Sequence, residues 1–69
     1  MCIATVYIDT DGELKEAMND VIRIEAENSR FRVINLIGKE ICIEGKIKHI
    51  DFWEEHAVDI EQEGGIDSV

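Results

Sequence analysis

The isoleucine and valine residues of this chain fall in short runs separated by polar turn segments, and this pattern constrains the fold more than any other feature. Runs of β-branched residues bounded by turn-forming residues are typical of strands. The chain contains no proline that would interrupt a run. The pattern therefore predicts that most of the chain forms β-sheet.

The first half of the chain predicts strand segments that precede and follow a turn signal. The first runs from Cys2 to Ile8 and ends at Asp9-Thr10-Asp11-Gly12, a strong turn signal. The segment from Glu13 to Met18 fits either a strand or one and a half turns of helix, and of these two we favour a strand. From Asp20 apolar and charged residues alternate, which predicts a strand with one buried face. The apolar residues of that face are Ile22, Ile24 and Ala26.

The second half predicts three more strands. One runs from Phe31 to Ile37, and Gly38-Lys39 predicts a tight connection to the next. That next strand is the longest, and Gly45 within it is expected to mark a bend. A last strand is expected from about His56 to Glu61, before the Gly64-Gly65 pair.

Five short strands in a chain of this size can bury their faces by curling into a ring. The predicted fold class is all-β, a small five-stranded antiparallel SH3-like or Sm-like barrel or a half-open sheet. We expect a single domain over residues 1–63 and a flexible C-terminal tail over residues 64–69.

Size and charge limit the function. A single core in 69 residues gives only a few kcal/mol of net stability, so stabilisation by a partner chain or a metal is expected. Sixteen acidic and seven basic residues give a net charge of −9, which repels a phosphate backbone and disfavours RNA as a partner. Two cysteines do not make a disulfide scaffold. The opening segment has the features of neither a signal peptide nor a membrane span, so we expect a cytoplasmic protein.

Cys2 is the candidate metal ligand, because a chain terminus adds little to core packing and a thiolate there has chemistry to offer. A thiolate and an adjacent backbone or terminal nitrogen can form a chelate ring that suits planar Ni(II) or Cu(II). One chain offers too few such ligands, but two copies of Cys2 across a twofold axis would complete a square plane. The alternative is that Cys2 is a small apolar residue at the start of an edge strand.

Other candidate residues have simpler interpretations. Cys42 fits a half-buried thiol, and His49 and His56 fit solvated surface positions, so none of them is assigned a role. The segment Asp9 to Glu13 lacks the full calcium-loop pattern and is interpreted as a turn. No recognisable catalytic motif is present, so no enzyme is inferred.

A basic stripe is a further possibility, because cationic residues and an aromatic residue on one sheet face can bind nucleic acid. Cross-strand pairing of these cations with glutamates is the favoured interpretation in a chain this acidic. The residues concerned are Lys46, Lys48, Arg23, Arg30, Arg32 and Trp53.

Several segments together resemble the CooT family, from Met1 to about Glu61. These segments are MCIATVYID with the DG turn after it, DVIRIEAE, LIGKE and IEGKIKHIDF. The resemblance implies a nickel-binding accessory protein of carbon monoxide dehydrogenase maturation, a homodimer, and a metal ligand at the cysteine after the first methionine, which is Cys2. It also implies an Sm-like barrel. Because of this similarity, members of the family have been labelled predicted RNA-binding proteins. HypC-type chaperones share the Met-Cys start but typically have a proline soon after it, where this chain has Thr5-Val6.

The sequence thus predicts a nickel-binding protein, a Ni(II) metallochaperone that holds one ion per homodimer through Cys2 of both chains. Its expected partners are a second copy and a nickel enzyme or the maturation factors of that enzyme. The alternative function is an Sm-like RNA-binding module.

Overall fold

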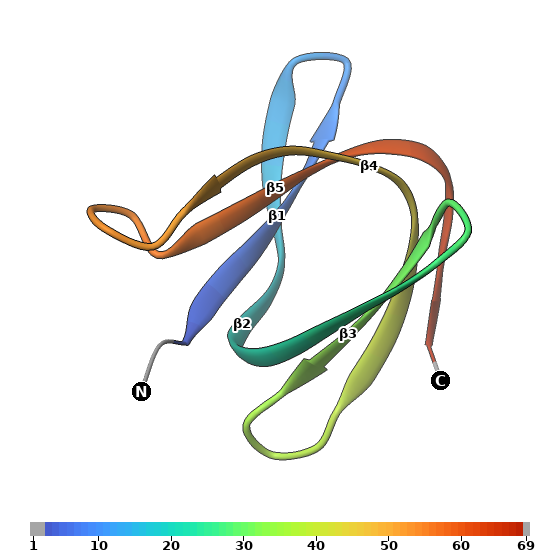
Figure 1. Cartoon of the computed structure of the whole chain (residues 1–69). Coiled ribbons are helices and arrows are strands. Elements are labelled where there is room, and N and C mark those ends of the chain that lie inside the picture. Colours follow the sequence, from blue (N-terminus) through green and yellow to red (C-terminus); the bar gives the residue numbers. More distant parts are fainter. Residues whose placement is uncertain (1–2, 69) are drawn as a thin grey trace.

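A computed structural model describes the backbone of residues 3–68 and the side chains of residues 3–63. Within these residues the chain forms five strands and no helix (Figure 1). The strands are β1 (Ala4–Thr10), β2 (Glu13–Glu27), β3 (Arg30–Asn35), β4 (Glu40–Asp51) and β5 (Ala57–Ser68). Each strand pairs with the next, and β5 pairs with β1, which makes a closed barrel. The predicted all-β, five-stranded barrel is confirmed.

The barrel closes through a parallel pair. Strands β1 to β5 alternate in direction, because each consecutive pair is antiparallel. The first and fifth strands therefore run the same way, and they align Val6 with Val58 and Ile8 with Ile60. Parallel pairing usually needs a long crossover connection, but here the three intervening strands carry the chain around the ring.

The core contains side chains from every strand. The largest fully buried ones are Val6, Val33, Ile43, Val58 and Ile60. Met18 and Val21 of β2 belong to the same cluster. Burying a Val, Ile or Met side chain contributes about 1.5–3 kcal/mol, so these residues supply most of the hydrophobic stabilisation of the barrel.

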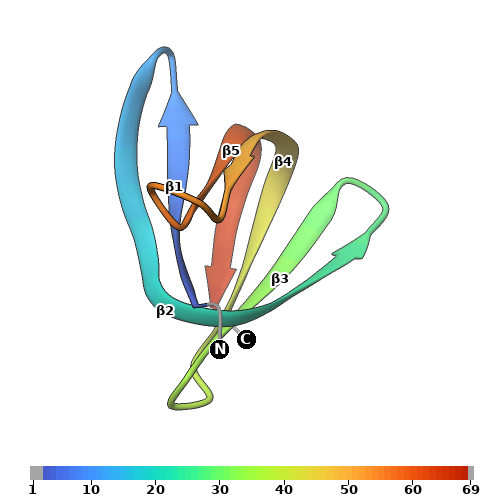
Figure 2. The same ribbon diagram turned by 60° about the vertical axis from the view of Figure 1, so that its left-hand side comes forward.

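The strand predicted to be the longest, β4, has 12 residues, whereas β2 has 15, because the segment Glu13–Met18 and the segment after Asp20 form one continuous strand. Both β2 and β4 bend and change partners, and the curve of β2 is visible in Figure 2. The first part of β2, including the ambiguous Glu13–Met18 segment, pairs with β1 as a strand, and the part after Val21 pairs with β3. In β4 the register shifts between Ile43 and Gly45, after which β4 pairs with β5 alone. The bend expected at Gly45 is therefore confirmed.

The prediction that Ile22, Ile24 and Ala26 bury one face of a strand is wrong in two respects. A bulge between Val21 and Arg23 makes Ile22 an extra residue in β2, so Val21 occupies the core position instead. Ile22 is 47% exposed. Ile24 is half-buried and Ala26 is exposed, because the barrel is open beside them.

The last strand is longer than expected. The sequence predicts an end near Glu61, but β5 runs to Ser68, and its second half pairs with the first half of β4. The backbone of residues 64–68 is thus part of the sheet, whereas the flexibility expected for residues 64–69 stays a prediction. The described part of the chain contains no helix long and apolar enough to cross a membrane.

Candidate functional site

Cys2, the metal ligand that the sequence predicts, lies outside the described residues. Its place in the chain still limits its position, because two peptide units span at most about 7 Å. The Cα atom of Cys2 is therefore within about that distance of Ala4, the first residue of β1. The surroundings of Ala4 are the described part of the candidate site.

Two elements lie beside the start of β1. Ala4 aligns with Val21 at the bulge of β2. On the other side, the backbone N–H of Thr5 donates a hydrogen bond of 2.9 Å to the carbonyl oxygen of His56, in the loop between β4 and β5. These contacts fix the direction in which the chain enters the barrel.

The structure places the other potential metal ligands at different distances from this point. Cys42 is half-buried on β4 and aligns with Arg32 and Asp67, on the far side of the ring from β1. His49 Nδ1 lies 3.7 Å from Asp59 Oδ2. Of these three residues, His56 alone has its backbone hydrogen-bonded at the start of β1. The described side chains contain no group of three or more His, Cys, Asp or Glu that could hold a metal.

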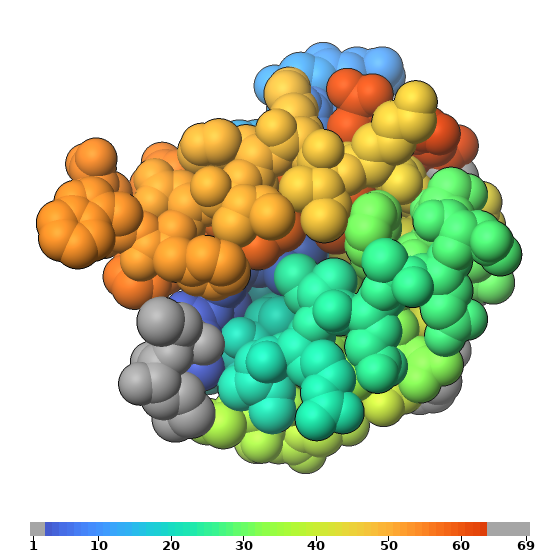
Figure 3. Space-filling view, in the orientation of Figure 1, coloured from blue at the N-terminus to red at the C-terminus, as the bar shows by residue number. Residues whose placement is uncertain are grey.

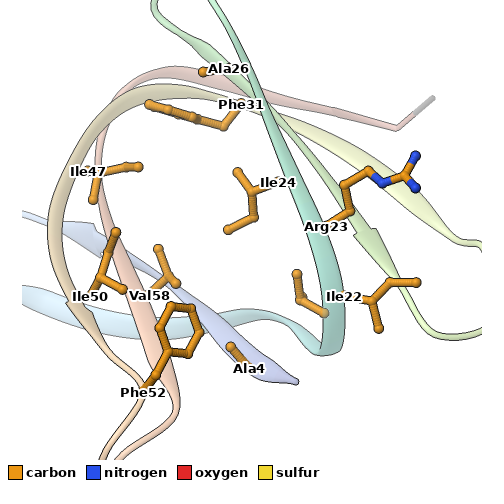
Figure 4. Close-up of a pocket in the computed structure, with 11 residues that line it drawn as sticks. Ala4, Ile22, Arg23, Ile24, Ala26, Phe31, Ile47, Ile50, Phe52 and Val58 are labelled. Atoms are coloured by element: carbon orange, nitrogen blue, oxygen red, sulfur yellow. The ribbon is translucent and has the colours of Figure 1, made fainter. Parts of the chain in front are cut away.

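An apolar groove of about 330 Å³ opens beside the start of β1. It exists because β2 after Val21 and β4 after Gly45 follow different partners, which leaves the inside of the barrel uncovered between them. We call it the β2–β4 groove, and Figure 4 shows its lining residues. Its main residues are Ala4, Ile24, Ile47, Ile50, Phe52 and Val58.

The groove is nearly free of charge. Among the described residues that line it, Arg23 alone is charged, and Figure 4 shows its guanidinium pointing away from the apolar side chains. Sequence reasoning missed this groove. The alternating Ile22, Ile24 and Ala26 were its signal, but alternation alone does not distinguish a covered face from an open one.

A hydrogen-bonded aspartate shapes the loop at one end of the groove. The carboxylate of Asp51 accepts hydrogen bonds from the backbone N–H groups of Trp53, at 2.8 Å, and Glu54, at 3.0 Å. The bonds from Glu54 and then Trp53 lower the pKa of Asp51, because they stabilise its charged form. The loop therefore holds Phe52 at the groove and leaves Trp53 88% exposed.

A second aspartate joins the hairpin of β1 and β2 to β4. Asp9 is buried, its Oδ1 accepts a 2.8 Å hydrogen bond from the N–H of Gly12, and its other oxygen pairs with Lys48. The hydrogen bond from Lys48 lowers the pKa of Asp9, and that same bond raises the pKa of Lys48. The interpretation of this segment as a turn is confirmed.

Several cations of the proposed basic stripe are paired with carboxylates. Besides Lys48, Arg32 lies 3.4 Å from Glu25 and 3.3 Å from Glu27. Lys46 Nζ lies 3.6 Å from an oxygen of Glu63. Cross-strand pairing with glutamates, the favoured interpretation, is confirmed for Arg32 and Lys46, whereas Lys48 pairs with an aspartate.

Fold and site together define a small all-β domain with an apolar groove beside the start of its first strand. The family model described as CO dehydrogenase accessory protein CooT matches residues 1–61. The chain therefore belongs to the CooT family, as its sequence resemblance indicated, and the family has an accessory role to CO dehydrogenase. No curated protein and no solved structure matches the chain.

Proposed function

We propose that this protein is a Ni(II) metallochaperone that holds one ion per homodimer through Cys2 of both chains and delivers it to a nickel enzyme. The observation that carries the proposal is the family match over residues 1–61, which includes Cys2. CO dehydrogenase is a nickel enzyme, so an accessory protein for it has a reason to handle this ion. The proposal includes a cytoplasmic location and no catalysed reaction.

Ligand chemistry supports a site shared between two chains. A square-planar Ni(II) ion takes four ligands, and thiolate sulfur with deprotonated backbone or terminal nitrogen suits it. Cys2 and a neighbouring nitrogen of one chain supply two ligands, and the same atoms of a second chain supply the others. The ion is cargo, and ligands at a chain end can exchange it with a recipient without unfolding the barrel.

A nickel titration followed by absorption spectroscopy tests the proposal. Thiolate-to-nickel bands are expected to saturate at one ion per two chains in the wild-type protein and to be absent in Cys2→Ser. Cys42→Ser and His56→Ala are the matched controls, one for a second thiol and one for the histidine at the start of β1, and both are expected to titrate like the wild type. Unchanged stoichiometry and affinity in Cys2→Ser would remove Cys2 from the mechanism.

RNA binding is the second candidate function, and the exposed ring of Trp53 favours it because bases stack on aromatic side chains. The pairing of Lys46, Lys48 and Arg32 with carboxylates opposes it, since these cations already have acidic partners that a phosphate would have to displace. RNA binding would show as salt-dependent affinity for short single-stranded RNA that Trp53→Ala weakens. No detectable complex at low salt would exclude this function.

A further inference from the structure

We infer that a second copy of this chain covers the β2–β4 groove, so that the homodimer forms groove to groove with the two β1 strands starting close to its twofold axis. The inference rests on the proposed function, because one ion held by two Cys2 residues requires the two N-termini to meet. It adds the face through which they meet. Four observations support it.

The first observation is exposed apolar surface. Ile47 is 42% exposed, and Ile50 and Phe52 are each 50% exposed, although all three line one groove. In Figure 4 these side chains and Ile24 surround the same space. Contiguous apolar surface of this kind on a small domain marks an interaction site, and covering it would stabilise a chain whose own core is small.

The second observation is charge, which selects the occupant. Two copies with a net charge of −9 each repel one another over most of their surfaces. Three other hollows that described residues line include carboxylates, for example Asp9, Asp11 and Glu61 around one of them. The β2–β4 groove has none among its described lining residues, so two copies can approach there with the least repulsion. A basic partner would instead favour the carboxylate-lined hollows, and an anionic membrane would repel the chain.

The third observation is the place of the N-terminus. Ala4 lines the groove, and Cys2 is within about 7 Å of it along the chain. A twofold axis that passes near Ala4 therefore brings both thiols within reach of one ion. A dimer through the hairpin of β1 and β2 would place that axis at the opposite end of β1.

The fourth observation is shape. The loop that contains Phe52 and Trp53 projects from the barrel next to the groove, as the orange segment of Figure 3 shows. In the proposed groove-to-groove dimer the loop of one copy lies against the groove of the other. Twofold symmetry makes this contact occur twice. The hydrogen bonds to Asp51 hold the loop in shape before association, which lowers the entropy lost on binding.

Sedimentation velocity of the metal-free protein over a range of concentrations tests the face. Ile50→Glu places a carboxylate in each groove, and we expect it to weaken the dimer at least tenfold. Leu14→Glu is the matched control, because Leu14 is 52% exposed but belongs to the hairpin of β1 and β2 and does not line the groove. Circular dichroism checks that both variants keep the barrel. The inference is overturned if Ile50→Glu dimerises like the wild type, or if Leu14→Glu dissociates the dimer instead.

Trp53 gives a second readout, because it is the one tryptophan of the chain. Its emission is expected to shift to shorter wavelength as the wild-type protein associates, with the midpoint found by sedimentation. Emission that stays constant through association would place the loop outside the interface and overturn the inference.

Cys2→Ser separates this inference from the proposed function. Without metal this variant is expected to remain a dimer, because the groove and not the thiol holds the two copies together. On titration it is expected to bind no nickel. A wild-type protein that is monomeric both with and without nickel overturns the inference, even if Cys2 still binds the ion. A dimer that keeps one nickel per two chains in Ile50→Glu overturns the inference and leaves the proposed function standing.

Discussion

Gly45 stands at the bend of β4, and adding a single methyl group there tests how closely β4 and β5 approach. A Cβ atom on Gly45 would lie 2.1 Å from the carbonyl oxygen of Glu61 and 3.1 Å from Cγ2 of Ile60. The oxygen is part of the β5 backbone, which pairs with β1 as well as β4, so it cannot rotate away. The two strands would have to separate by roughly 1 Å, which forfeits dispersion contacts along the core.

Overpacking of this kind costs about 1–3 kcal/mol. We expect Gly45→Ala to lower the free energy of unfolding by about that amount. For a domain of this length each kcal/mol lowers the melting temperature by about 4–8 °C, so the decrease should be measurable by calorimetry. Gly45 is not among the residues with positive φ, so the effect comes from the clash and not from backbone strain.

Gly38→Ala is the control, because Gly38 has φ +88° and a methyl group added to it would meet no atom within 4 Å. Its effect comes from the left-handed backbone alone, at about 1–2 kcal/mol. Amide exchange distinguishes the variants: Gly45→Ala should accelerate exchange along β4 and β5, and Gly38→Ala only in its turn. A Gly45→Ala protein within about 0.5 kcal/mol of the wild type would refute the reasoning.

Three further predictions concern the core, the ion pair and the loop. Ile43→Ala should lower the free energy of unfolding by about 2–5 kcal/mol in urea denaturation, enough to unfold a barrel of this size in part; a smaller loss would mean that the site collapses around the gap. Asp9→Asn should lower the urea midpoint at neutral pH. The Asp9 contribution is present above about pH 3.8 and disappears as pH falls through its lowered pKa. The Lys48 contribution is present below about pH 10.5 and disappears as pH rises through its raised pKa. The midpoints of variant and wild type should therefore converge at both extremes. Asp51→Ala should accelerate amide exchange at Trp53, and unchanged exchange would show that Asp51 does not hold the loop.

Local sequence patterns predicted the strands and turns because these depend on neighbouring residues. The Asp9 to Gly12 segment forms its turn through a hydrogen bond that spans three residues. The bend at Gly45 was also visible, since glycine within a strand commonly marks a close approach of backbones. The extension of β5 to Ser68 was not, because its pairing with β4 joins residues more than twenty positions apart.

The bulge in β2 shows why burial was harder to predict than the strand. Ile22, Ile24 and Ala26 alternate with charged residues in the sequence, yet Val21 takes the core position. One extra residue reverses the alternation, and its place depends on the pairing with Asn35 and Ile34 across the sheet. The alternation from Ile22 to Ala26 contains no mark of the bulge.

The candidate site divides in the same way between chemistry and geometry. Cys2 was predicted as a ligand from the chemistry of a terminal thiol, and that prediction is independent of the fold. The groove beside it lies where β2 and β4 separate from each other. In β2 the change of partner occurs at Val21, and in β4 it occurs at Gly45. If the groove is the dimer interface, these two bends determine where the thiols of two chains meet. A substitution that straightens β4 would then weaken nickel binding without touching a ligand, which links the stability measured in Gly45→Ala to the metal titration.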